Sequence, residues 1–119
     1  MIVFVSLASS GVFTKMEDEQ WVMGEYVGKV LAKLHIDNPG VVYIAPSIQN
    51  YVLLPYIDQV EDNNIGPTYE SWKSRCRQLI EVSDKLVVIK TPGWEKSVGV
   101  ADEIAYAKAN RLPIEYIDA

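Results

Sequence analysis

The sequence KLVVIKTPGWEKSVGVADEIAYAKANRLPIEYI, residues 85–117, holds the pattern that decides the fold. Lys85 to Ile89 is a short run rich in β-branched residues, and Thr91-Pro92-Gly93-Trp94 ends it in a turn. Ser97 to Asn110 carries apolar residues at helical intervals, and Leu112 to Ile117 is a further strand-like run. A strand, a helix and a strand in this order predict a βαβ unit with parallel strands.

The N-terminal half of the chain shows the same alternation. Ile2 to Ala8 is an apolar, β-branched run that is typical of a central parallel strand. The capping-box spacing of Thr14-Lys15-Met16-Glu17 predicts the start of a first helix, whose apolar stripe continues to Leu34. Val41 to Ala45 predicts a second strand, and Tyr69 to Ser83 predicts a second helix. We therefore expect an α/β fold, a doubly wound, flavodoxin-like or Rossmann-like parallel sheet of four to five strands with helices on both faces.

The length and composition indicate a single domain that spans residues 1 to 119. A hydrophobic content of 49% with 23% charged residues is ordinary globular usage. The formal net charge of -5 disfavours general nucleic-acid binding, although a local site can still hold a small anion. The single cysteine, Cys76, and the single histidine, His35, predict neither a disulfide nor a metal site. The apolar run from Met1 to Ala8 lacks a basic lead-in and is too short to span a membrane, so we expect a cytoplasmic protein.

Three loops follow the expected strands at the carboxyl edge of the sheet, where ligands of such folds bind. They comprise residues 8–13, 45–48 and 90–99. The third is the most informative, because Gly93, Lys96, Ser97 and Gly99 stand directly before or at a helix start, which favours a phosphate or a carboxylate.

Glu103 lies one turn into that helix. Two interpretations of it carry equal weight from residue type alone: a functional carboxylate, or an acidic residue that with Asp102 merely complements the positive helix end. Two interpretations of Trp94, in the preceding loop, also stay open: its ring stacks on a base, or it packs as a lid.

The ordered segments Ser83 to Ile89, Pro92 to Ala107 and Leu112 to Ile114 resemble the nucleoside 2-deoxyribosyltransferase-like superfamily, in particular its small bacterial and phage members. The likeness lies in a Gly-Trp, Ser-x-Gly, Glu, Ala pattern and covers Trp72 to Ile117. It implies an N-glycoside hydrolase or pentosyltransferase that acts on a small nucleoside or nucleotide without a cofactor. It also implies a homo-oligomer, for which the segment Tyr51 to Tyr69 could provide the contact.

The resemblance implies a role for each matching residue. Glu103 corresponds to the nucleophile that attacks the anomeric carbon and releases the base, with Asp84 and Cys76 at the other two catalytic positions. Ser97 and the Gly99 amide correspond to the contacts of a 5′-phosphate. The residues that the resemblance assigns to substrate binding are Ser6, Ala8, Ser9, Ser10, Gly11, Pro46, Gly93, Trp94, Ser97 and Gly99.

Two positions depart from the family pattern. Ser6 stands where active members carry a tyrosine, and Cys76 stands where they carry an aspartate thought to protonate or orient the base. A thiol is a poor substitute for a carboxylic acid, although Glu70 or Glu81 could stand in. Three hypotheses follow: an N-glycosidase or transferase, a nucleotide-binding module that has lost its acid, and a purely structural α/β protein.

Overall fold

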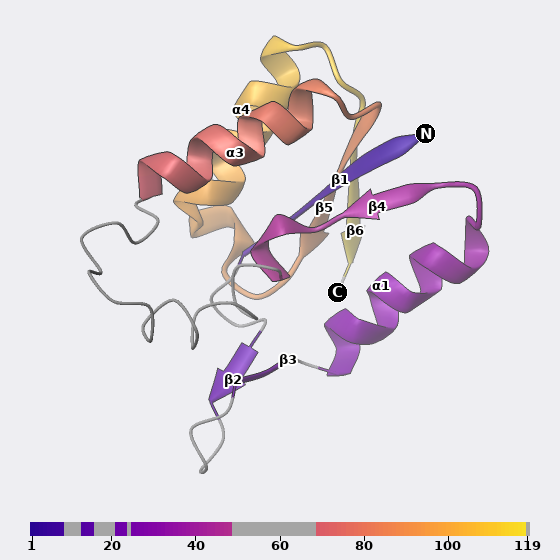
Figure 1. Ribbon diagram of the computed structural model, residues 1–119. Helices are drawn as coiled ribbons and strands as arrows, with labels where there is room; N and C mark the ends of the chain where they lie inside the picture. The colour runs from indigo at the N-terminus through magenta and orange to yellow at the C-terminus, as the bar shows by residue number, and fades with distance from the viewer. Residues whose placement is uncertain (9–12, 16–20, 24, 49–68, 119) are drawn as a thin grey trace, which may run out of the picture.

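The computed structural model contains a four-stranded sheet in which every pair of neighbours is parallel (Figure 1). It describes residues 1–8, 13–15, 21–23, 25–48 and 69–118. The strands lie in the order β4-β1-β5-β6, with the bounds β4 Val42–Ile44, β1 Ile2–Leu7, β5 Lys85–Lys90 and β6 Ile114–Asp118. In chain order this is 2-1-3-4, the flavodoxin-like arrangement, which confirms the expected fold class.

Helices cover both faces of this sheet, as Figure 1 shows. Helix α1 (Glu25–Asp37) packs on one face, where Val27 joins the core formed by Val3 and Val5. Helices α3 (Tyr69–Glu81) and α4 (Val98–Ala109) lie side by side on the other face. A short 3-10 helix, η2 (Trp94–Lys96), leads from β5 into α4.

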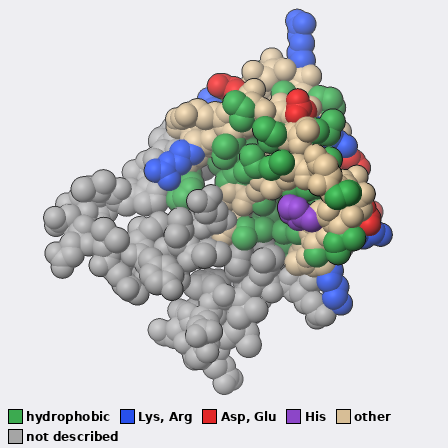
Figure 2. Space-filling model, turned by 45° about the vertical axis from the view of Figure 1, so that its right-hand side comes forward, with side chains coloured by type: hydrophobic (Ala, Val, Ile, Leu, Met, Phe, Trp, Pro, Cys, Tyr) green, Lys and Arg blue, Asp and Glu red, His purple; other side chains and the backbone are tan. Residues whose placement is uncertain are grey.

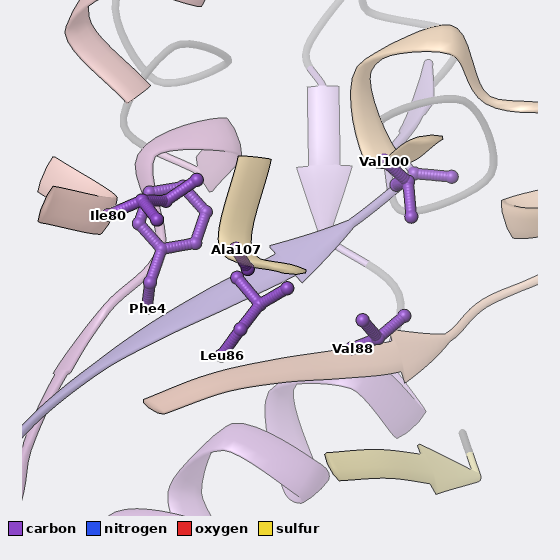
Figure 3. Packing of buried hydrophobic residues seen from close by; sticks show 7 residues of the cluster. Phe4, Ile80, Leu86, Val88, Val100 and Ala107 are labelled. Atoms are coloured by element: carbon purple, nitrogen blue, oxygen red, sulfur yellow. The ribbon is translucent and has the colours of Figure 1, made fainter. Parts of the chain in front are cut away.

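The period-2 alternation of β1 divides the core into two clusters. Val3, Val5 and Leu7 belong to the cluster under α1, whereas Phe4 and Ala8 belong to the cluster under α3 and α4. Figure 3 shows the second cluster, in which residues of β1 and β5 meet residues of both helices: Phe4, Ile80, Leu86, Val88, Val100 and Ala107. Ser6 has the same parity as Phe4 and Ala8, so β1 directs its side chain toward the α3 and α4 face.

The expected start of the first helix is wrong. The chain instead forms an antiparallel hairpin of β2 (Phe13–Lys15) and β3 (Trp21–Met23), in which Phe13 pairs with Met23, and α1 begins at Glu25. Thr14 therefore lies in a strand. Aromatic and β-branched residues concentrate in these two short segments and favour a strand, and cross-strand pairing prevails over the local capping signal.

Several large hydrophobic side chains remain at the surface, and Figure 2 shows hydrophobic residues gathered on one face of the molecule. Among the described residues these are Met1, Ile36, Val42, Val82, Val98 and Tyr116. No helix in the described part of the chain is both long and apolar enough to cross a membrane. Homo-oligomerisation stays a prediction, and the segment expected to provide the contact lies almost entirely outside the described residues.

Candidate functional site

The centre of the site is a hydrogen bond between two residues that are 97 positions apart in the sequence. Ser6 Oγ donates to Glu103 Oε2 at 3.2 Å, and both residues are buried, with exposed fractions of 0% and 7%. Glu103 is buried because it lies on the same stripe of α4 as Val100 and Ala107, which faces the sheet. Ser6 lies on the face of β1 that packs against α4, and Glu103 lies on the face of α4 that packs against the sheet. The two residues thus meet within a largely apolar layer.

Burial controls the protonation of Glu103. Desolvation raises its pKa from the usual value near 4.5 to about 8, the hydrogen bond from Ser6 acts in the opposite direction, and the charge of Asp102 raises the pKa further. The carboxyl group is therefore largely protonated at neutral pH. Because strongly perturbed pKa values cluster at functional sites, this carboxyl group is a candidate for chemistry.

Cys76, on α3, packs against the core cluster that contains Val100 and Ala107 of α4, and the charge of Glu103 acts on its thiol. Its thiol pKa is raised to about 12, first by burial and then by the negative charges of Glu103 and Asp102. A thiol with so high a pKa does not donate a proton efficiently at neutral pH, nor does it form a reactive thiolate.

Asp102, next to Glu103 in α4, links α4 to α3 through ion pairs. Arg77 binds both of its carboxylate oxygens, with Nη2 to Oδ1 at 2.7 Å and Nε to Oδ2 at 3.3 Å, and Lys73 Nζ lies 3.8 Å from Oδ1. Arg77 also lies over the ring of Tyr106, whose hydroxyl donates to Glu81. The basic residues of α3 thus link α3 to α4. The carboxylate of Glu81 accepts the exposed hydrogen bond from Tyr106.

Replacing Asp102 with asparagine should affect both stability and the site. We expect Asp102→Asn to lower the free energy of unfolding by about 1 kcal/mol, because the bidentate contact with Arg77 is lost. It should also lower the pKa of Glu103, because a neighbouring negative charge is removed. Urea unfolding measures the first effect, and NMR titration of the carboxyl carbon measures the second.

Asp118→Asn is the matched control, because it breaks the exposed pair that Lys90 forms with Asp118 at 2.9 Å. The control should change the unfolding free energy by less than about 0.5 kcal/mol and leave the pKa of Glu103 unchanged. A Glu103 pKa that responds equally to both variants would contradict the electrostatic role of Asp102.

A cavity of about 660 Å³ opens at the carboxyl end of β5, and the described residues that line it are Lys90, Thr91, Pro92, Gly93, Trp94, Glu95 and Lys96. Thr91 is fully buried, and its Oγ1 has no hydrogen-bond partner among the described residues. Gly93 has a φ of 83°, a left-handed conformation that side chains disfavour, so this glycine shapes the turn. Trp94 packs against Tyr116 with ring centroids 5.7 Å apart while it lines the cavity.

The start of α4 leads directly out of this cavity loop. Ser97 Oγ accepts a hydrogen bond from the Val100 N–H at 3.2 Å, which is the standard N-cap contact. The first turn of α4 carries no acidic residue, so the positive end of the helix is not neutralised there. The Gly99 amide, in the same turn, is one of the first N–H groups of the helix, which have no partner within it.

The strand register relates the cavity to the buried pair. Ser6 is paired with Val88, two residues before β5 ends at Lys90, and the residues that line the cavity begin at Lys90. The buried pair and the cavity thus share the carboxyl edge of β1 and β5. The chain order of the sheet reverses between these two strands, and ligands of open α/β sheets bind at such a switch point.

The other expected site residues divide into two groups. Ala8 and Pro46 are buried at this same edge, and Ser47, next to Pro46, donates to the Leu7 carbonyl at 3.5 Å. Asp84 precedes β5 and therefore lies at the opposite, amino edge, where its carboxylate accepts a hydrogen bond from the Ile2 N–H at 2.7 Å. The structure does not bring Asp84 to Glu103.

Ser9, Ser10 and Gly11 lie outside the described residues. No group of three or more His, Cys, Asp or Glu residues within the described ranges has the arrangement of a metal site.

Comparison with protein families gives one match. The family described as "Domain of unknown function (DUF1937)" matches residues 25–118, more than three quarters of the chain. The chain belongs to this family. The DUF1937 match extends from α1 to β6 and so includes Cys76, Ser97 and Glu103, whereas Ser6 precedes it. Neither the curated proteins nor the solved structures gave a match.

Proposed function

We propose that this protein cleaves the N-glycosidic bond of a nucleoside or nucleotide, with Glu103 as the nucleophile. The observation that carries the proposal is the buried Glu103 carboxyl group, held by Ser6 at the switch point of the sheet. The resemblance of residues 83–114 to the nucleoside 2-deoxyribosyltransferase-like superfamily supports it, because Glu103 takes the position of that family's nucleophile.

The proposed chemistry has two steps. A Glu103 oxygen attacks the anomeric carbon as the base departs, and the resulting glycosyl ester is transferred to water or to a second base. Ser6 orients the carboxyl group through its hydrogen bond. The start of α4, with the Ser97 hydroxyl and the Gly99 amide, would hold a 5′-phosphate, and the cavity beside Trp94 would hold a further part of the substrate.

One observation favours a second candidate function, a nucleotide-binding module without turnover. The position expected to provide the acid is occupied by Cys76, whose thiol pKa of about 12 excludes efficient proton donation at neutral pH. Such a module would bind nucleotides in the same site and release no base.

Base release distinguishes the two functions. The protein is incubated with ribo- and deoxyribonucleosides, their 5′-monophosphates and pyridinium nucleosides, and the free base is quantified by chromatography. Release above the spontaneous rate from at least one substrate class is expected. Binding detected by calorimetry together with an absence of release from every substrate would establish the module and overturn the enzyme.

A further inference from the structure

The surroundings of Glu103 restrict the kind of base that can leave. A neutral base departs with an additional negative charge and needs a proton from a nearby acid, a contribution worth about a hundredfold or more in rate. A base that is already cationic departs as a neutral molecule and needs none. The groups that face Glu103 therefore indicate which of the two kinds of substrate the site fits.

The described groups around Glu103 come from three elements. Ser6, from β1, offers an alcohol, and Cys76, from α3, offers a thiol with a pKa of about 12. Asp102, from α4, accepts hydrogen bonds from Arg77 on both oxygens and has Lys73 nearby, so its oxygens are engaged with these two cations. None of these described groups is a proton donor suited to neutral pH.

The charges of the residues around Glu103 also favour a cationic substrate. The neighbouring charge that acts on Glu103 is the negative charge of Asp102, while the cations Arg77 and Lys73 bind Asp102 itself. A cation placed next to Glu103 would stabilise its ionised, nucleophilic form, since an opposite charge at close range favours the charged state. A cationic substrate would thus generate the nucleophile on binding, whereas a neutral one would leave the carboxyl group protonated.

We propose that the substrates are N-glycosides whose base already carries a positive charge, such as pyridinium or N7-alkylated purine nucleosides and nucleotides. The inference rests on the proposed function and narrows its substrate class. The Glu103 carboxylate forms a bond to C1′ as the C1′–N bond breaks, and the bonding electron pair neutralises the ring nitrogen. Water then attacks C1′, the ester bond breaks to restore the Glu103 carboxylate, and the remaining proton passes to solvent. Atoms and charges balance without a further reactant.

The test uses two substrates that differ by one methyl group and one positive charge, 7-methylguanosine and guanosine. At slightly acidic pH we expect kcat/KM for base release to be about a hundredfold or more higher for 7-methylguanosine, since none of the described groups around Glu103 is an acid that would equalise the two leaving groups. With nicotinamide riboside, whose charge is fixed, kcat/KM should rise with pH along a single limb as Glu103 ionises. Glu103→Gln should remove release from both cationic substrates.

The outcomes separate this inference from the proposed function. Release of guanine and 7-methylguanine at similar kcat/KM would reveal an acid in the site and overturn the cationic substrate class, while the glycosidase function stood. A falling limb at high pH with nicotinamide riboside would overturn it as well. An absence of release from all three nucleosides and their 5′-monophosphates would overturn the cationic substrate class, and deoxynucleoside release would then decide the glycosidase function separately.

Discussion

Glu103→Gln should lower base release by about a thousandfold or more, because an amide cannot form the glycosyl ester. Glutamine has nearly the same shape and can still accept the hydrogen bond from Ser6, so the fold should be retained. The measurement is kcat on the best substrate, with far-ultraviolet circular dichroism to verify the fold.

The matched control is Glu115→Gln, an exposed carboxylate of β6 that pairs with Lys85 and does not line the cavity. This variant should retain base release within about threefold, because its side chain takes no part in the displacement. Equal activity of Glu103→Gln and wild type would eliminate Glu103 as the nucleophile.

The buried carboxyl group should also make stability depend on pH. The pKa of Glu103 is raised on folding from near 4.5 to about 8, so the folded state binds more protons than the unfolded state between these two values. Its contribution to stability is complete below about pH 4.5 and is lost as the pH rises through 8. Relative to Glu103→Gln, the wild-type free energy of unfolding should therefore fall by a total on the order of 5 kcal/mol across this window.

Urea unfolding of both proteins at several pH values measures this difference. The two stability curves should converge at the acidic end of the window and separate toward the alkaline end, with Glu103→Gln the more stable protein there. Parallel curves would show that Glu103 titrates normally and is not buried as described. A glutamine that increases stability while it removes activity would be the expected signature of a carboxyl group retained for chemistry.

The sheet and its helices could be predicted because their signals are local. The β-branched run of β5, the turn at Gly93 and the helical period of α4 follow one another within a single βαβ unit, and the structure has them at nearly the expected bounds. The hairpin of β2 and β3 could not be predicted in this way. Its strands are three residues each, and their pairing depends on contacts that a capping-box pattern at Thr14 does not reveal.

The candidate site was predictable in part. Glu103, Ser97 and Gly93 lie where the loop and helix pattern suggests, but the contact between Ser6 and Glu103 depends on tertiary packing. The sequence nevertheless contains a signal for this contact. Ser6 is the polar residue in an apolar strand pattern of period 2, and Glu103 is the polar residue in an apolar helix stripe of period 3.6.

Asp84 illustrates the opposite case. It precedes its strand, so the topology alone places it at the amino edge, away from the ends where ligands bind. The role of Asp102 as a link to Arg77 was not apparent either, because it depends on how two helices pack.

The most direct test of the account is to trap the glycosyl ester. A 2′-fluoro-substituted pyridinium nucleoside slows both steps by destabilising the oxocarbenium-like transition state, while its good leaving group still allows the first step. Mass spectrometry of the digested protein should find one fluorinated pentosyl group on the peptide that contains Glu103, and none on the Glu103→Gln variant. Labelling of a different residue, or base release with no labelled protein, would contradict the central claim.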